Sequence, residues 1–229
     1  MLKAVIFDLD GTLYDYDAAH AAAWDTLTAF AESRLGFAPG RFAALHTQAE
    51  ETLRRRCGGG AAIHNRLLRY QVLLEAAGKP IALAPAMAEV YWTTLLENAI
   101  PLPGAMDALA RLRAAGLRVG IGTNMTADWQ FAKLERLGLT PLIDFMVTSE
   151  EAGAEKPEAR LFELCAEKAG CAPGECAFVG DSLKGDALGA RDAGMRAVWL
   201  CRKSGATQAP EGVAVIRSLN ELPKSLSPL

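Results

Sequence analysis

The sequence predicts an α/β fold, in which a doubly wound, mostly parallel β-sheet carries an all-helical domain inserted after its first strand. Three observations support this prediction. Short apolar runs alternate with helical stretches, polar residues follow several of the runs, and residues 15–99 contain no convincing strand. We therefore expect an α/β core formed by residues 1–14 and 100–229, and a separate helical domain formed by residues 15–99.

The first strand is expected in residues 2–7, a run rich in Val, Ile and Phe that ends at Asp8. A short run of β-branched and aromatic residues that leads into a polar turn is typical of a buried strand. Runs of the same character follow at residues 117–121, 145–148, 176–179, 197–200 and 213–216.

Helices are expected between these strands. Their predicted ranges are 105–115, 127–137, 157–169 and 183–193. Three of them end at a glycine, namely Gly138, Gly170 and Gly194, and one begins with Pro157, which suits the first turn of a helix. Strands that alternate with helices predict parallel pairing, with helices covering both faces of the sheet.

The inserted region is rich in Ala, Leu and Arg. Apolar residues recur at helical spacing, for example at Trp24, Leu27 and Ala31, and glycines 58–60 interrupt the pattern. This composition predicts several helices joined by short breaks.

The composition excludes some classes of function. The chain has 229 residues and a net charge of −3, so it lacks the broad basic field that holds a nucleic-acid backbone. It has no run of about 18 apolar residues that could span a membrane, and its first residues do not resemble a signal peptide. The five cysteines form no CxxC pair. We expect a cytoplasmic protein that is a monomer or a small homo-oligomer and binds neither nucleic acid nor membrane.

Polar residues gather after four of the predicted strands. Because the carboxyl ends of parallel strands meet at one edge of a sheet, these residues are expected to form a single site. They are Asp8 and Asp10 after the first strand, Thr123 and Asn124 after the second, Lys156 after the third, and Asp181, Ser182 and Asp186 after the fourth.

This set of residues indicates a particular chemistry. Four carboxylates in one cleft repel one another unless a cation is present, and oxygen ligands suit Mg²⁺. A metal ion, a lysine and a hydroxyl can together hold the three oxygens of a phosphoryl group. A carboxylate is also a competent nucleophile toward phosphorus. The residues therefore predict phosphoryl transfer through an aspartyl-phosphate.

Four motifs carry a resemblance to a known family. They are DLDGT at residues 8–12, GTN at 122–124, EKP at 155–157 and GDSLKGD at 180–186. In this order and at strand ends they resemble the motifs of the haloacid dehalogenase-like hydrolase superfamily, over roughly residues 1–14 and 100–205. The helical insert resembles the mobile cap of that family, in relatives similar to phosphoglycolate phosphatases and small nucleotidases.

The resemblance implies roles for the two aspartates of the first motif. Asp8 would attack phosphorus and bind Mg²⁺ through its other oxygen. Asp10 would protonate the leaving group and then deprotonate the water that cleaves the aspartyl-phosphate. The backbone carbonyl of Asp10 would also ligate the metal.

The other motifs would bind the phosphate and the metal. The resemblance implies that Thr123 and the amide of Asn124 bind phosphate oxygens, and that Lys156 neutralises the nucleophile and the phosphate together. Asp181 would ligate Mg²⁺. Asp186 would hold a metal-bound water or orient Lys156.

Some neighbouring residues have a structural interpretation. Thr12 is expected to bond local backbone, and Ser182 its own loop or the loop of the first motif. In the inserted domain, Arg56, His64 and Arg66 flank the glycine break. They are candidates for substrate contact, and a solvated helix face is the alternative explanation.

We expect a Mg²⁺-dependent phosphomonoesterase that acts on a small phosphorylated metabolite. A sugar-phosphate mutase of the same superfamily stays open, because mutases keep the acid at the position of Asp10. A haloacid dehalogenase is disfavoured, because the dehalogenases lack that acid. A non-enzymatic binding protein is a further alternative. A family member that has lost its activity should, however, lose Asp8 or Asp10 first, and both are present.

Overall fold

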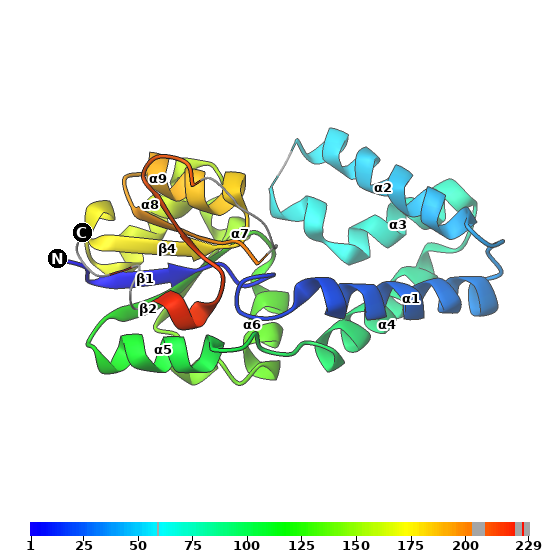
Figure 1. The fold of residues 1–229 in the computed structure, drawn as a ribbon. Helices are drawn as coiled ribbons and strands as arrows, with labels where there is room; N and C mark the ends of the chain where they lie inside the picture. The colour runs from blue at the N-terminus through cyan, green and yellow to red at the C-terminus, as the bar shows by residue number, and fades with distance from the viewer. Residues whose placement is uncertain (59, 203–208, 223–225, 227–229) are drawn as a thin grey trace. The chain divides into compact units, whose positions relative to one another are not determined.

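The computed structural model describes residues 1–58, 60–202, 209–222 and 226 (Figure 1). The chain divides into two compact units. One is formed by Met1–Asp15 and Ile100–Leu229, and the other by Tyr16–Ala99. The expected boundary lay one residue earlier, so Asp15 belongs to the first unit. Gly59, the middle residue of the predicted glycine break, lies outside the described residues.

The first unit is built on a six-stranded sheet with the strand order β3-β2-β1-β4-β5-β6, in which all neighbouring strands are parallel. The two central strands, β1 and β4, are buried along their whole length, as expected for a sheet covered on both faces. The strands are β1 (Ala4–Phe7), β2 (Arg118–Thr123), β3 (Phe145–Thr148), β4 (Cys176–Gly180), β5 (Arg196–Leu200) and β6 (Val213–Ile216).

Helices cover the sheet on both sides, with α8 and α9 on one face and α5 on the other (Figure 1). Because side chains alternate along a strand, Ala4 and Ile6 of β1 face the side of α8, where they join a core with Phe162 and Phe178. The helices of this unit are α5 (Ala105–Ala114), α6 (Ala127–Arg136), α7 (Ser149–Ala152), α8 (Ala159–Ala169), the π-helix η5 (Leu183–Leu188), α9 (Gly189–Asp192) and the 3₁₀ helices η3 (Thr140–Leu142), η4 (Pro173–Glu175) and η6 (Leu219–Glu221). The predicted fold class is confirmed.

Two predicted helices differ in detail. The helix predicted from Pro157 begins at Ala159, and the helix predicted over 183–193 is divided into η5 and α9. The second difference has a local cause. The carbonyl of Ser182 accepts hydrogen bonds from the backbone N–H groups of both Asp186 (2.9 Å) and Ala187 (3.2 Å), so the first turn is wider than an α-helical turn.

The second unit contains only helices in its described part. They are α1 (Tyr16–Leu35), α2 (Arg41–Cys57), α3 (Arg66–Ala77) and α4 (Ala84–Glu97), with the 3₁₀ helices η1 (Ala61–His64) and η2 (Ile81–Leu83). Asn65 caps α3, because its side chain accepts a hydrogen bond from the N–H of Leu68 at 3.1 Å. Across the described residues of both units, no helix combines the length and the apolar character needed to cross a bilayer.

Candidate active site

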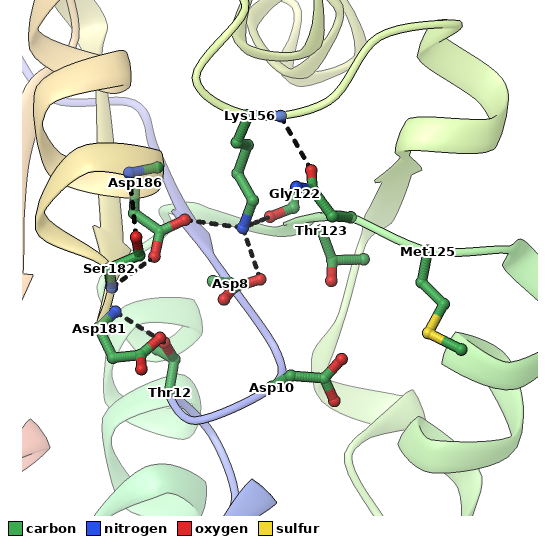
Figure 2. A network of polar contacts seen from close by, with 12 residues as sticks. Asp8, Asp10, Thr12, Gly122, Thr123, Met125, Lys156, Asp181, Ser182 and Asp186 are labelled. Atoms are coloured by element: carbon green, nitrogen blue, oxygen red, sulfur yellow. Dashed lines mark hydrogen bonds and ion pairs between the residues drawn. The ribbon is translucent and has the colours of Figure 1, made fainter. Parts of the chain in front are cut away.

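The polar residues predicted from the sequence lie together beyond the carboxyl ends of β1, β2 and β4 (Figure 2). Asp8 directly follows β1, Thr123 is the last residue of β2, and Asp181 directly follows β4. Lys156 comes from the loop between α7 and α8 and points at Asp8. Three strands of the parallel sheet and the loop that contains Lys156 thus bring residues from four separate motifs to one edge.

Lys156 is the centre of this arrangement. Its Nζ atom lies 2.7 Å from Oδ1 of Asp8 and 2.7 Å from Oδ1 of Asp186, and it donates to the carbonyl of Gly122 at 3.2 Å. Its side chain is only 5% exposed. The backbone N–H of Lys156 donates to Oδ1 of Asn124 at 2.9 Å, which ties the lysine loop to the end of β2. The ammonium group is therefore fixed against the Asp8 carboxylate.

Burial and neighbouring charges shift the pKa values of this pair. Burial raises the pKa of Asp8 to about 7; the charges of Asp186 and Asp181 act in the same direction, and the charge of Lys156 opposes them. For Lys156, burial alone would lower the pKa, but the charges of Asp186 and Asp8 raise it above its ordinary value. Asp8 is thus a carboxylate whose ionisation depends on nearby positive charge.

Three carboxylates form a cluster that could hold a metal ion. One oxygen atom from each of Asp8, Asp181 and Asp186 lies within 4.8 Å of the other two. The loops fix two of these side chains. Oδ2 of Asp186 accepts from the N–H of Ser182 at 2.9 Å, and the hydroxyl of Thr12 donates to Oδ1 of Asp181 at 3.3 Å.

The cluster fits a hard divalent cation. Its donors are all carboxylate oxygens, and Lys156 supplies only one positive charge against three carboxylates. Burial and the charge of Asp186 also raise the pKa of Asp181, which indicates unbalanced negative charge. The carboxylate of Asp10 is held elsewhere, so only its backbone carbonyl remains as a potential ligand from that residue.

Asp10 has a different set of partners. Nζ of Lys133 lies 2.6 Å and 2.8 Å from its two carboxylate oxygens, and the Tyr14 hydroxyl also donates to it. Nε2 of Gln130 is 3.3 Å from Oδ2 of Asp10 and donates to Oγ1 of Thr123 at 2.7 Å. Burial alone would raise the pKa of Asp10, but the charge and hydrogen bonds of Lys133 hold it below its ordinary value.

Sequence reasoning missed Gln130, Lys133 and Tyr14. A signal for two of them exists in the spacing along α6. Gln130, Lys133 and Leu134 recur three and four residues apart, and all three are buried, with exposures of 0%, 0% and 2%. Polar residues on the buried face of an amphipathic helix indicate a partner inside the protein.

The candidates in the helical unit have different surroundings. Arg56 is exposed in the last turn of α2, and His64, the last residue of η1, is half-buried. Arg66 is 9% exposed and donates through Nη2 to the Tyr91 hydroxyl at 3.2 Å. A solvated helix face therefore describes Arg56 but not Arg66.

Comparison with known families decides the identity of this chain. A family model described as haloacid dehalogenase-like hydrolase matches residues 2–194. This chain belongs to that hydrolase family. The resemblance inferred from the four motifs is confirmed, and so is the prediction that the chain is a hydrolase.

Individual relatives of this haloacid dehalogenase-like hydrolase have different names. It is 36% identical over 225 residues to a ribulose-1,5-bisphosphate 5-phosphatase from Halopiger xanaduensis, covering 95% of this chain and 93% of the relative. It is 33% identical over 202 residues to a glyceraldehyde 3-phosphate phosphatase from Methanothermobacter thermautotrophicus, covering 86% and 85%. The crystal structure of a 2-haloacid dehalogenase from Pseudomonas syringae is similar with a TM-score of 0.79 and 28% identity, covering 99% of each chain.

Proposed function

We propose that this hydrolase is a Mg²⁺-dependent phosphatase that releases inorganic phosphate from a small sugar phosphate through an aspartyl-phosphate on Asp8. The observation that carries the proposal is the contact of 2.7 Å between Asp8 and the buried Lys156, beside the cluster formed with Asp181 and Asp186. A nucleophilic carboxylate, a fixed cation and a metal-binding cluster at one strand edge are the parts that phosphoryl transfer needs.

Asp8 is the proposed nucleophile. Its carboxylate oxygen attacks phosphorus, the bond from phosphorus to the ester oxygen breaks, and the phosphoryl group is transferred to Asp8. Lys156 binds an oxygen of the transferred group while it also contacts Asp8, so attraction offsets the repulsion between two anions. The hydroxyl of Thr123 and the backbone N–H of Asn124, at the end of β2, bind further phosphate oxygens.

Asp10 is the proposed acid and base. It gives a proton to the departing ester oxygen and then takes a proton from the water that attacks the phosphorus of the aspartyl-phosphate. In the arrangement described here Asp10 accepts hydrogen bonds from Lys133 and Tyr14, which suits its ionised form and hence the second step. To donate a proton in the first step, its carboxyl group has to move away from Lys133.

Asp8, Asp181 and the carbonyl of Asp10 are the proposed ligands of Mg²⁺. When bound, the ion neutralises the carboxylates and the charge that develops on the phosphoryl oxygens. Asp186 orients Lys156, which it contacts at 2.7 Å, and its own position depends on the N–H of Ser182.

The names of the relatives support a sugar-phosphate substrate. Both phosphatases described above are named for sugar phosphates, of five and three carbon atoms, and each aligns with more than four fifths of this chain. The dehalogenase alternative has support from the Pseudomonas syringae structure. It is disfavoured because halide leaves without a proton, so that reaction has no use for an acid at Asp10.

Phosphate release from a panel of esters tests the proposal. The panel contains triose, tetrose and pentose phosphates, a phosphorylated hydroxy acid and a nucleoside monophosphate, each with Mg²⁺ and with EDTA. We expect release that requires Mg²⁺ and is lost in Asp8→Asn. Asp192→Asn, at an exposed position of α9, is the matched control and should retain the activity of the wild type.

Two further measurements separate the alternatives. Reduction of the quenched enzyme with borohydride should convert a phosphorylated Asp8 to homoserine, detected by mass spectrometry of the N-terminal peptide. Halide release from a haloacid without Mg²⁺ would instead support a dehalogenase. Isomerisation of a sugar phosphate that depends on a bisphosphate activator, with little net release of phosphate, would support a mutase.

A further inference from the structure

The helical unit contains a buried pair of arginines with too little negative charge around it. Arg66 and Arg69 are one turn apart on α3, and they are 9% and 5% exposed. Nη1 of Arg69 lies 3.4 Å from Oε2 of Glu50. Arg66 forms no ion pair within the described residues, and its guanidinium lies 4.9 Å from the centroid of the Tyr91 ring. Among the described residues, Glu50 is therefore the one carboxylate that forms an ion pair with either of these two cations.

The neighbouring side chains do not supply the missing charge. His20 is hydrogen-bonded to the Tyr91 hydroxyl at 2.8 Å, and burial, together with the charge of Arg66, lowers its pKa. Burial raises the pKa of Tyr70 although Arg66 opposes the shift, so this phenol stays neutral. The cluster thus has a net positive charge in the interior of the unit, where an uncompensated charge is costly.

Several donors of this cluster also lack acceptors. Nε of Arg66, Nε of Arg69 and the hydroxyl of Tyr70 are buried and have no hydrogen-bond partner among the described residues. Buried donors are nearly always hydrogen-bonded, so three unused ones in a single cluster need an explanation. An oxyanion would accept these hydrogen bonds and balance the charge at the same time.

We propose that Arg66, Arg69 and Tyr70 form a binding site for a phosphate or carboxylate group within the helical unit. Guanidinium groups suit this ligand, because their planar fork donates two parallel hydrogen bonds to an oxyanion. The oxyanion is either a second anionic group of the substrate or a free anion from solution. The first source rests on the proposed phosphatase function, whereas binding itself does not.

An NMR titration tests binding directly. The Hε–Nε cross-peaks of Arg66 and Arg69, assigned with Arg66→Gln and Arg69→Gln, are followed as inorganic phosphate is added to the full-length protein. We expect both cross-peaks to shift and saturate together, because their Nε–H groups gain an acceptor. Arg34, exposed in the last turn of α1, is the control whose cross-peak should not follow this curve. The absence of a shift at Arg66 and Arg69 up to millimolar phosphate would overturn the proposal.

Steady-state kinetics then distinguish the two sources. The kcat/KM for a phosphate ester with a second anionic group is divided by the kcat/KM for an ester that is otherwise uncharged. If the substrate supplies the oxyanion, this ratio falls about tenfold in Arg66→Gln, since a hydrogen bond to a charged group is lost. Arg34→Gln should leave the ratio unchanged. A saturable NMR shift with an unchanged ratio in Arg66→Gln assigns the site to a free anion.

The proposal stays testable if a variant does not fold or if the enzyme hydrolyses none of the esters. If Arg66→Gln does not fold, it is replaced by Arg66→Lys, which keeps the charge and loses only the planar fork. The phosphate titration itself is carried out on the wild type, and variants are used only to assign its cross-peaks. If the wild type releases phosphate from no ester, the proposed function fails while the NMR titration still decides whether the oxyanion site exists.

Discussion

Asp8 and Asp10 are two residues apart in the chain, yet their surroundings shift their pKa values in opposite directions. Burial and two neighbouring carboxylates raise the pKa of Asp8 to about 7. Lys133, with Tyr14 and Gln130, holds the pKa of Asp10 below its ordinary value against the effect of burial. Adjacent carboxylates with separated pKa values are a common basis for dividing chemical roles. Each carboxylate faces a lysine that lowers its pKa, so the difference comes from the carboxylates of Asp186 and Asp181 beside Asp8 and from the added hydrogen bonds to Asp10.

Lys133 is a positioning residue in this scheme, and Lys133→Met tests it. Its ammonium contacts both oxygens of Asp10, so its loss should impair the proton transfers of Asp10, whereas the proposed phosphate-binding residues Thr123 and Lys156 are unchanged. We expect kcat to fall by about 10²-fold with little change in KM, the size of effect typical of acid–base catalysis.

The controls for this variant lie on the same helix. Arg136→Met removes an exposed cation from α6 and should leave kcat unchanged, and Lys133→Arg should recover part of the activity. Circular dichroism verifies that each variant is folded. A Lys133→Met enzyme with the kcat of the wild type would show that Asp10 needs no cation beside it.

At the scale of the elements, the strand-end loops pack so closely that some of their glycines cannot carry a side chain. Gly11 has φ +82°, and a Cβ atom built on it would lie 2.6 Å from Oδ2 of Asp181. The loop after β1 and the loop after β4 therefore meet at Gly11. The position of the proposed metal ligand Asp181 depends on the absence of a side chain there.

Comparing Gly11→Ala with Gly116→Ala separates this contact from backbone strain. Gly116 has φ +78° and open space around its Cβ position, so both variants strain the backbone by roughly 1–2 kcal/mol. Only Gly11→Ala should also push Asp181 away. We expect similar losses of stability in urea, but a higher Mg²⁺ concentration for half-maximal activity only in Gly11→Ala. Equal Mg²⁺ dependence in both variants would contradict the proposed role of Asp181.

Sequence patterns predicted the strands well because each strand has its own local signal. The runs predicted at 145–148 and 213–216 coincide with β3 and β6, and the remaining strands differ by a residue or two at their ends. The π-helix η5 could not be predicted, since its wide first turn depends on the Ser182 carbonyl accepting two backbone hydrogen bonds. The spacing of apolar residues in the sequence does not indicate this pattern of backbone hydrogen bonds.

The residues predicted to lie together were found from their positions at or shortly after the ends of strands. Asp8, Thr123 and Asp181 could be found in this way, because parallel strands end at one edge. For Lys133, the spacing along α6 indicates only that it shares a helix face with Gln130 and Leu134, and not which residue it contacts. Its partner Asp10 is 123 residues away in the chain, and only the fold brings the two together.

At the scale of the whole molecule, the two units keep polar groups in their interiors in different ways. In the α/β unit the buried Lys156 faces two carboxylates. In the helical unit the buried Arg66 and Arg69 lie near histidines that stay neutral. In the folded α/β unit the ionisation of Asp8 is disfavoured, and in the folded helical unit the protonation of His20 and His46 is disfavoured, so we expect the two units to respond differently to mild acid.

The last prediction concerns the effect of His46 on stability in acid. Burial, and then the charges of Arg69, Arg66 and His20, lower the pKa of His46 to about 3. An unfolded histidine has a pKa of about 6.5, so between these two values the unfolded state binds more protons than the folded state. The contribution of His46 to stability is therefore complete above about pH 6.5. It is lost progressively toward pH 3, by at most about 1.4 kcal/mol per pH unit.

Amide hydrogen exchange at pH 7, 6 and 5, corrected for the intrinsic exchange rate, measures this loss separately in each unit. In the wild type, protection of α2 should fall as the pH is lowered. His46→Phe keeps an aromatic ring beside Trp24 but cannot be protonated, so its α2 should lose less protection. Helix α8 of the other unit is the internal control, where the two proteins should behave alike. Equal losses of protection in α2 of both proteins would mean that His46 does not determine the acid sensitivity of the helical unit. The next residue to replace would then be His20, because burial and the charges of Arg66 and Arg69 lower its pKa as well.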